Sequence, residues 1–293
     1  MKNIIVVTGG AGYVGSNLIR HFISNTNYKI ISIDNYSSGS KNNHIKNAKV
    51  NYIKGDTNEI ENKLNKYKKK IQAVFHFGEF SRIHQSFLNI NKCLKYNIEG
   101  TSSVIRFCLN NKIKLIYSAT SASLGNKGKD QNLSPYSFTK SKNLKLIVHL
   151  NKNFGLKSEI LYFYNVYGRN HIRTGEMSTV IGIFENQYLK NKNLTVTKPG
   201  TQKRIFTHID DTVRGCFMAW KKNKNRHYAL SGNKEFTIVQ IAKLFGKSIS
   251  LIKSRLGERK KSSKPKFVSG FKIHNIKCNT SIEKYISNFI KKN

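Results

Sequence analysis

A tyrosine and a lysine four residues apart, Tyr136 and Lys140, are the residues of this sequence best suited to acid–base chemistry. Residues at i and i+4 share one face of a helix, and Pro135 directly before the tyrosine is typical of a first helical turn. A nearby ammonium favours the phenolate and lowers the pKa of a tyrosine toward a useful range. The hydroxyl-rich segment Tyr117–Ser123 continues from an expected strand upstream, where a hydroxyl can share a proton with the tyrosine and with a substrate oxygen. Taken alone, a Tyr-x-x-x-Lys pair is common on solvent-facing helices.

A glycine-rich turn, Thr8–Gly15, directly follows the first expected strand and opens a helix. Its glycines allow a tight turn and a close approach to a pyrophosphate, to which the helix N-terminus offers unpaired N–H groups. Asp34 ends the next strand, where an acidic residue accepts hydrogen bonds from an adenosine ribose and repels a 2′-phosphate. We therefore expect NAD rather than NADP; the alternative is a structural turn with Asp34 as a helix cap. Asp56, after the third strand, is either an adenine-edge acceptor or part of a plain turn.

Short β-branched runs alternate with helix-length segments in the first half of the chain, which predicts an α/β fold with a parallel, doubly wound sheet of the Rossmann type. The alternation breaks after Tyr164, so a smaller mixed α/β region is expected beside the sheet. We expect residues 1–165 to form the sheet domain, 204–228 to return to it, and 166–203 and 229–293 to bind substrate. The expected strands are Ile4–Thr8, Lys29–Ile33, Val50–Ile53, Ala73–Phe77, Lys114–Ser118 and Glu159–Tyr164. The expected helices are Gly15–Ser24, Phe87–Leu109, Tyr136–Asn153, Met177–Leu189, Asp210–Trp220, Thr237–Phe245 and Ser281–Ile290.

The sequence is strongly basic, with 52 Lys and Arg against 15 Asp and Glu and a net charge of +37. That balance first suggests a nucleic-acid partner. Only ten of the 52 are Arg, however, and the Lys residues are scattered among Asn and Ile, whereas nucleic-acid readers concentrate Arg and aromatic side chains. We interpret the charge as solvated surface that also attracts anionic substrates, and expect no specific nucleic-acid binding.

Several other classes of protein do not fit the sequence. No apolar run is long enough to cross a bilayer, and the first residues run directly into a strand, so we expect neither a transmembrane helix nor a signal peptide. The four cysteines have neither CxxC spacing nor a disulfide framework, which is typical of a reduced cytoplasmic protein. No set of His, Cys, Asp and Glu has metal-ligand spacing, so we expect no metal.

With these motifs in this order, the sequence resembles the extended short-chain dehydrogenases, specifically the NAD-dependent nucleotide-sugar epimerases and dehydratases typified by UDP-glucose 4-epimerase. The resemblance runs nearly end to end. It implies that Thr120 is the catalytic hydroxyl residue, that Tyr136 is the base and that Lys140 holds the nicotinamide ribose. The matching segments are Thr8–Gly15, Ile33–Gly39, Gly55–Asp56, His76–Gly78, Asn97–Thr101, Pro135–Lys140, Tyr164–Gly168, Arg204–Asp211 and Arg255–Glu258.

The resemblance also implies which residues bind the ligands, apart from Glu79 and Arg82, which stand where the sequence departs from the family pattern. A homodimer is implied too, paired through the helices Phe87–Leu109 and Tyr136–Asn153. The expected NAD-binding residues are Gly9, Gly12, Tyr13, Val14, Gly15, Asp34, Asn35, Asp56, Phe77, Gly78, Asn97, Tyr136 and Lys140. The residues expected to bind a UDP- or GDP-linked sugar are Glu79, Arg82, Thr120, Asn165, Arg204, Arg255 and Glu258.

The sequence departs from the family pattern in two places. His76–Arg82 replaces the usual small-residue run after the fourth strand, so Glu79 and Arg82 either enter the nicotinamide or sugar pocket or form a buried salt bridge. The loop between Thr120 and Tyr136 is short, as in similar relatives from surface-polysaccharide pathways. Two further side chains are given structural interpretations: Arg259 as an arginine on a solvated loop, and His208 as a packed histidine.

The leading hypothesis is epimerisation through transient oxidation at C4 of a nucleotide-linked hexose. The enzymatic alternatives are a 4-dehydrogenase and a 4,6-dehydratase, and the alternative from another class is a non-catalytic Rossmann-like protein that binds RNA. A dehydratase needs an additional acid and base beside the sugar, which the family commonly supplies as Asp-Glu after the catalytic threonine. Ser121 and Ala122 stand there in this sequence, which leaves Glu79 as the one nearby acidic candidate.

Overall fold

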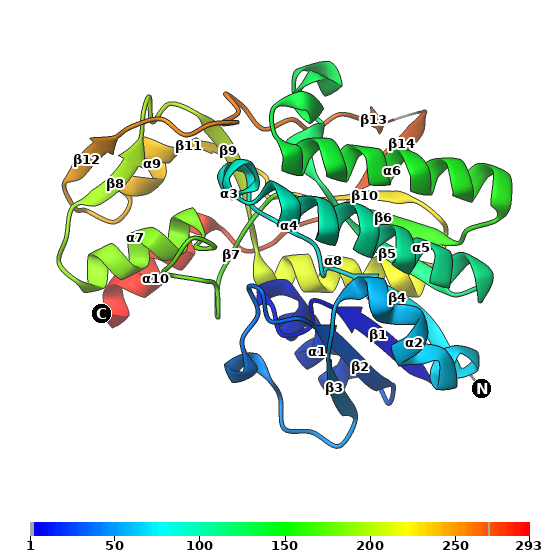
Figure 1. The fold of residues 1–293 in the computed structure, drawn as a ribbon. Helices are drawn as coiled ribbons and strands as arrows, with labels where there is room; N and C mark the ends of the chain where they lie inside the picture. Colours follow the sequence, from blue (N-terminus) through cyan, green and yellow to red (C-terminus); the bar gives the residue numbers. More distant parts are fainter. Residues whose placement is uncertain (1–2, 269) are drawn as a thin grey trace.

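The computed structural model describes residues 3–268 and 270–293, and its centre is a nine-stranded sheet (Figure 1). The strand order is β13-β14-β10-β6-β5-β4-β1-β2-β3, and every pairing is parallel except that of β13 with β14. The strands are β1 (Ile4–Thr8), β2 (Lys29–Asp34), β3 (Val50–Lys54), β4 (Ile71–His76), β5 (Lys114–Thr120), β6 (Ser158–Phe163), β10 (His227–Leu230), β13 (Phe267–Val268) and β14 (Phe271–Asn275).

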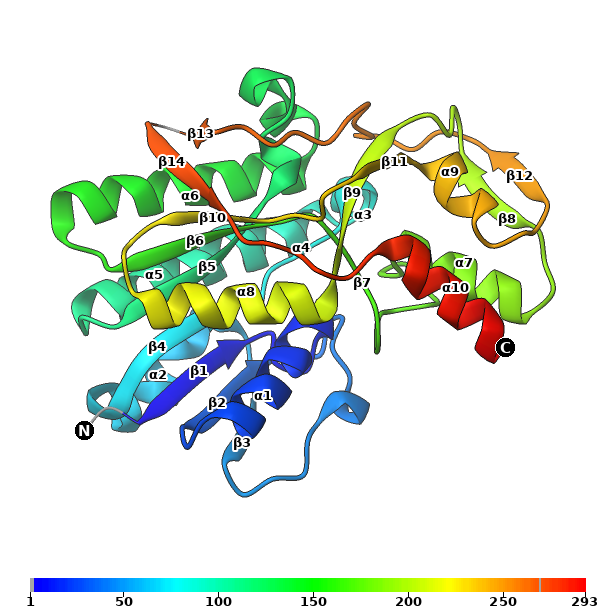
Figure 2. The same cartoon turned by 180° about the vertical axis from the view of Figure 1, so that it is seen from behind.

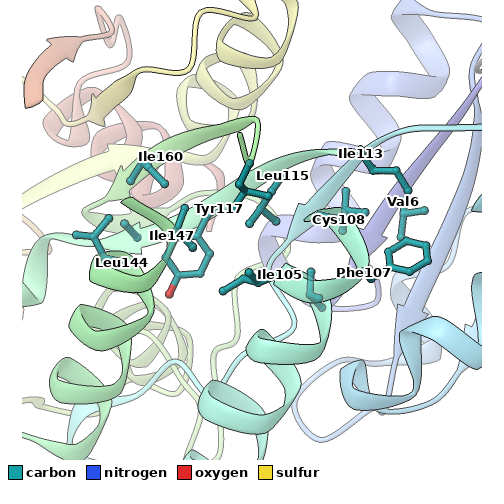
Figure 3. Close-up of a cluster of buried hydrophobic side chains, with 14 of the residues drawn as sticks. Val6, Ile105, Phe107, Cys108, Ile113, Leu115, Tyr117, Leu144, Ile147 and Ile160 are labelled. Carbon is teal, nitrogen blue, oxygen red and sulfur yellow. The ribbon is translucent and has the colours of Figure 1, made fainter. Parts of the chain in front are cut away.

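Helices cover both faces of this sheet, as expected for a doubly wound fold. On one face lie α2 (Ile60–Leu64), α3 (Ile83–Leu88), α4 (Ile90–Leu94), α5 (Thr101–Asn110) and α6 (Pro135–Phe154) (Figure 1). On the other lie α1 (Tyr13–Asn25) and α8 (Ile209–Lys222), which are in front in Figure 2. Figure 3 shows how side chains of β5, α5 and α6, among them Leu115, Tyr117, Ile105 and Ile147, form one continuous core.

A smaller lobe has a core of its own, which includes Phe184, Phe245 and Ile286. In this lobe β8 (Leu194–Thr197) pairs with β12 (Ile249–Ile252), while β11 (Glu235–Thr237), β9 (Lys203–His208) and β7 (Asn165–Tyr167) form a three-stranded sheet. The helices α7 (Val180–Leu189), α9 (Ile238–Lys243) and α10 (Ile282–Lys292) pack around these strands (Figure 2).

The predicted α/β architecture is confirmed, but two details of the prediction are wrong. The expected single helix Phe87–Leu109 is interrupted at Asn89, and a π-helical stretch, Lys95–Gly100, separates α4 from α5. The domain assignment is the second: residues 229–293 do not all belong to the smaller lobe, because β10 and β14 extend the main sheet next to β6. Residues 204–208, expected to return to the main sheet, lie instead in β9 of the three-stranded sheet. Within the described ranges, no helix combines the length and apolar character that a membrane span requires.

Candidate functional site

A cleft of about 660 Å³ lies at the carboxyl ends of the central strands, where open α/β sheets bind ligands. Its walls come from the turn after β1, the loop after β4, the end of β5, the start of α6 and the segment 255–259 of the smaller lobe. Of the residues expected from the sequence to bind a cofactor or substrate, all line this cleft except Asp56 and Asn97. The fold therefore brings together motifs that lie up to 250 residues apart in the sequence.

The turn between β1 and α1 is too crowded for any residue larger than glycine at two positions. Gly9 has φ +70°, and a Cβ there would lie 2.8 Å from the backbone nitrogen of Gly78. A Cβ on Gly15 would lie 2.2 Å from the carbonyl oxygen of Gly9. Gly12 precedes α1 and supplies no side-chain cap, so the N–H groups of the first turn remain available to an anion. This arrangement fits a bound pyrophosphate.

Asp34 faces the cleft from the end of β2 with a buried carboxylate. One of its oxygens accepts a hydrogen bond from the Ala11 backbone N–H (2.9 Å) and the other from that of Tyr36 (2.8 Å). Burial raises the pKa of this carboxyl, and the backbone hydrogen bonds partly offset the effect. The two bonds orient the carboxylate, and the remaining lone pairs can accept hydrogen bonds from ribose hydroxyls.

Asp56 and Asn97 do not line the cleft, but both hold residues that do or that lie next to them. The Asp56 carboxylate pairs with Lys95 (2.7 Å) and accepts a hydrogen bond from Asn35 (2.6 Å). Asn97 is fully buried, and its amide bonds both the N–H (2.7 Å) and the carbonyl (3.2 Å) of Phe80. Asn97 therefore fixes the loop after β4, which carries several of the cleft residues.

Tyr136 and Thr120 meet where β5 ends and α6 begins. Ser134 caps α6 by accepting a hydrogen bond from the Ser137 N–H (3.1 Å), and this cap sets the direction of the first turn, which carries Tyr136. Burial raises the pKa of the Tyr136 phenol, whereas the nearby side chain of Thr120 lowers it. The pair can pass a proton to or from an oxygen bound between them.

Lys140 forms a buried ion pair with Glu79, an arrangement that the sequence did not specify. The ammonium donates to Glu79 Oε2 and to the carbonyl oxygen of Ser118, and it lies 4.4 Å from the centre of the Tyr117 ring. The other carboxylate oxygen of Glu79 accepts hydrogen bonds from Thr101 (3.0 Å), Tyr117 (3.2 Å) and Asn143 (3.3 Å). The negative charge of Glu79 opposes the effect of burial, which lowers the pKa of Lys140.

Burial has the largest effect on the pKa of Tyr136 and raises it, while the charges of Arg82 and Arg259 lower it. Lys140, which the sequence led us to expect in that role, is paired with Glu79. Arg82 Nη2 and Nε donate to the carbonyl oxygen of Met177 (2.6 and 3.0 Å). Arg82 therefore does not form the salt bridge with Glu79 that was one of its two interpretations.

The smaller lobe supplies charged side chains to the other end of the cleft. Arg204 is buried, and its Nη2 lies 3.8 Å from Oε1 of Glu258. Arg255 lines the cleft with an exposed side chain. Asn165 donates to the carbonyl oxygen of Ile205 (2.9 Å). Arg204 and Arg255 therefore bring positive charge to this end of the cleft, which suits a negatively charged ligand.

Arg259 and His208, for which the sequence suggested purely structural roles, differ in their surroundings. Arg259, expected on a solvated loop, is buried in the cleft wall, so that interpretation is wrong. His208 accepts a hydrogen bond from the Asp210 N–H at the start of α8 (3.2 Å) and packs against the rings of Tyr167 and Tyr285, as expected for a packed histidine. In the part of the chain that the structure describes, no group of His, Cys, Asp and Glu is arranged to hold a metal ion.

Comparisons with known proteins agree with this geometry. Residues 5–231 match the family described as the NAD-dependent epimerase/dehydratase family. An ADP-L-glycero-D-manno-heptose-6-epimerase of Brachyspira hyodysenteriae is 26% identical over 257 residues, which cover 82% of this chain and 79% of that protein.

Two solved structures share the fold. A UDP-glucuronic acid 4-epimerase variant of Bacillus cereus, solved with NAD and a UDP-4-deoxy-4-fluoro-glucuronic acid, is 25% identical, with a TM-score of 0.83 and coverage of 99% of both chains. A UDP-glucose 4-epimerase of Thermotoga maritima, solved with UDP-glucose, has a TM-score of 0.84 at 22% identity and covers 98% of this chain and 97% of its own.

Proposed function

Because the chain belongs to the NAD-dependent epimerase/dehydratase family, we propose that it inverts C4 of a nucleotide-linked hexose by transient oxidation at that carbon. The observation that carries the proposal is that Tyr136 and Thr120 line the cleft together, near enough for the threonine side chain to act on the phenol. A hydroxyl pair in this position can remove and return the proton of a sugar hydroxyl, which both half-reactions need. The cofactor of the family, NAD, supplies the hydride acceptor for the first half and the donor for the second.

The cofactor fits the first half of the cleft. Gly9 and Gly15 leave room for a pyrophosphate beside the N-terminus of α1. Asp34 is oriented to accept hydrogen bonds from the adenosine ribose and would repel the extra phosphate of NADP. Asn35, Phe77 and Gly78 also line the cleft.

The proposed roles of the remaining residues follow from their places in the cleft. Tyr136 takes the proton of the C4 hydroxyl during oxidation and returns a proton to this oxygen after the 4-keto sugar has rotated to present its other face. Thr120 donates a hydrogen bond to the same oxygen. Lys140 keeps a positive charge at the end of β5, where it donates to the Ser118 carbonyl oxygen with Glu79 as its counter-ion. Arg204 and Arg255 bind the nucleotide diphosphate. Each role is independent of which nucleotide base the substrate carries.

Loss of water from the sugar is disfavoured by the state of Glu79. A 4,6-dehydratase would need it to take the C5 proton and to assist departure of the C6 hydroxyl. Its carboxylate is held by Lys140 and by three further donors, one of them Tyr117, and so lacks the freedom to serve both steps. Ser121 and Ala122, which follow Thr120, supply no acid in its place.

The test is to incubate the NAD-loaded protein with UDP-glucose, UDP-glucuronic acid and GDP-mannose and to analyse the products by mass spectrometry and NMR. Unchanged mass with inverted C4 supports the epimerase. A product lighter by one water would make the protein a dehydratase, and a loss of two hydrogens would make it a 4-dehydrogenase. A Tyr136→Phe variant serves as the negative control.

A homodimer is part of the same proposal, and one apolar surface supports it. Large apolar side chains stand exposed on the helices that the family pairs in its dimers. They lie on α3, α4 and α6 and include Leu88, Ile90, Leu94, Phe138 and Leu146. Exposed apolar groups on neighbouring helices are typical of a protein–protein contact.

A further inference from the structure

Arg259 has more hydrogen-bonding capacity than the described part of the protein uses. The residue is 5% exposed and lines the cleft. Its Nη1 donates to the carbonyl oxygen of Ser121, 2.7 Å away. Its Nε is buried, and no described residue accepts a hydrogen bond from it. A buried charged donor without a partner is costly, so this edge of the guanidinium is suited to a ligand.

Arg259 lies close to the residues proposed to act on C4 of the sugar. Ser121, whose carbonyl oxygen accepts the Nη1 hydrogen bond, directly follows Thr120, and the Thr120 side chain lies near enough to Tyr136 to act on its phenol. The charge of Arg259 acts on the Tyr136 phenol and lowers its pKa, although burial has the larger and opposite effect. The guanidinium therefore lies close to the hydroxyl pair that handles the oxidised carbon.

The positive charge near Arg259 is incompletely balanced by the protein. Burial lowers the pKa of Arg259 to about 10, and the neighbouring charge of Arg204 acts in the same direction. No described carboxylate forms an ion pair with Arg259; Asp130 acts on it only through its charge, and Glu258 pairs with Arg204. Arg82 adds a further cation that acts on Tyr136, and its guanidinium donates to the backbone carbonyls of Ser81 and Met177. This end of the cleft is therefore suited to an anion.

The geometry of a hexose decides which anion could reach this point. In a nucleotide sugar the diphosphate is attached at C1, across the ring from C4. The C6 group is attached to C5, the direct neighbour of C4. When the C4 oxygen lies between Thr120 and Tyr136, a substituent at C6 is therefore closer to their hydroxyls than the diphosphate is. A planar guanidinium matches the two oxygens of a carboxylate.

We propose that Arg259 binds a carboxylate at C6 of the sugar, so that the preferred substrates are nucleotide-linked uronic acids. This inference rests on the proposed function, since it assumes that the C4 oxygen lies at Tyr136. Under this proposal, Arg259 determines the specificity for an acidic hexose over a neutral one. The diphosphate contacts proposed for Arg204 and Arg255 are shared by both kinds of substrate.

The experiment measures binding by calorimetry to the NAD-loaded protein, with UDP-glucuronic acid, UDP-glucose and UDP as ligands. GDP-mannuronic acid, GDP-mannose and GDP form a second series, in case the protein selects guanine. We expect the wild type to bind the acid most tightly. Arg259→Gln should weaken binding of the acid by about 10- to 100-fold, the worth of a charged hydrogen bond. Binding of the neutral sugar and of the free nucleotide should change by less than about threefold.

Two further variants separate charge from shape. Arg259→Lys keeps the charge but loses the planar fork, so its affinity for the acid should fall between those of the wild type and Arg259→Gln. Arg226→Gln removes the same charge from an exposed position outside the cleft and should leave all affinities unchanged. Circular dichroism verifies the fold of each variant.

Three results would overturn the inference. A wild type that binds UDP-glucose as tightly as UDP-glucuronic acid, with the same equality in the GDP series, refutes it without any variant. An equal loss for acid, neutral sugar and free nucleotide in Arg259→Gln would make this residue a diphosphate contact instead. If no nucleotide sugar of either series binds although NAD does, the proposed function itself fails, and the specificity inference fails with it.

Discussion

Removing either charge of the Glu79–Lys140 pair should destabilise the protein, with opposite dependence on pH in the two variants. The two side chains are 3% and 4% exposed, respectively. Glu79→Gln keeps the size of the side chain but leaves the Lys140 ammonium without its counter-charge. Lys140→Met leaves the Glu79 carboxylate with neutral donors only. Breaking a buried pair in this way costs about 3–5 kcal/mol of unfolding free energy.

In each single variant the loss of unfolding free energy has an upper limit, because the unpaired Lys140 or Glu79 can become neutral instead of staying charged. A lysine with an ordinary pKa of about 10.4 gives up its proton at pH 7 for about 4.6 kcal/mol, at about 1.36 kcal/mol per pH unit. A glutamate takes up a proton at pH 7 for about 3.7 kcal/mol. Losses just below these limits are therefore expected for Glu79→Gln and Lys140→Met, respectively.

The sign of the pH dependence follows from which state binds more protons. In folded Glu79→Gln the pKa of the unpaired Lys140 is lowered, so the unfolded chain binds more protons and stability rises with pH up to about 10. In Lys140→Met the folded protein retains the extra proton on Glu79, so stability falls as pH rises above about 4. The double variant has no unpaired charge and should show neither slope.

Thermal unfolding followed by circular dichroism at pH 6, 7.5 and 9 measures these effects. A loss of 1 kcal/mol lowers Tm by about 2–4 °C in a chain of roughly this size. The double variant should lose much less than the two single variants together, because each single variant has an unpaired buried charge. Strictly additive losses, or the same pH slope in both single variants, would show that Glu79 and Lys140 do not depend on each other.

Three further predictions concern the site and the surface. Tyr136→Phe should leave NAD binding nearly intact and lower turnover by at least about 10²-fold; near-full activity would disprove its role as the base. Asp34→Ala should narrow the preference for NAD⁺ over NADP⁺ in a titration of the apoprotein, and a wild type that prefers NADP⁺ would contradict the assignment. Leu94→Asp should convert a dimer to a monomer in light scattering at micromolar concentration, whereas a monomeric wild type would exclude the proposed dimer.

The strands were predictable because a parallel strand with both faces covered is an almost continuous apolar run. β1 was predicted with both of its ends, and all six predicted strands are present. The helical segment Phe87–Leu109 was not predictable in detail. Its apolar pattern continues through Asn89, whose ψ of 49° interrupts the helix, and through the π-helical stretch Lys95–Gly100. Hydrophobic spacing does not reveal where a helix changes its hydrogen-bond pattern.

The site was predictable where its residues form local motifs, and much less so where tertiary contacts create it. The glycine turn and the Tyr136–Lys140 spacing carry their meaning within a few residues. Glu79 and Lys140 are 61 residues apart, and Arg259 and Ser121 are 138 apart. Arg259 stands in the charged run Glu258–Lys261, which is typical of a solvated loop. Only the packing of that segment against the end of β5 buries it, and no local pattern encodes such packing.

The charges around Tyr136 connect the choice of substrate to the chemistry. Lys140 is neutralised by Glu79, so the positive charges that favour the phenolate of Tyr136 come from Arg82 and Arg259. A carboxylate bound to Arg259 would cancel part of that charge and would therefore raise the pKa of Tyr136. The same arginine would then strengthen the binding of an acidic sugar and keep the phenol protonated to higher pH while that sugar is bound. With a neutral sugar bound, the charge of Arg259 would still lower the pKa of Tyr136, but the sugar would lack the contact between Arg259 and a carboxylate at C6.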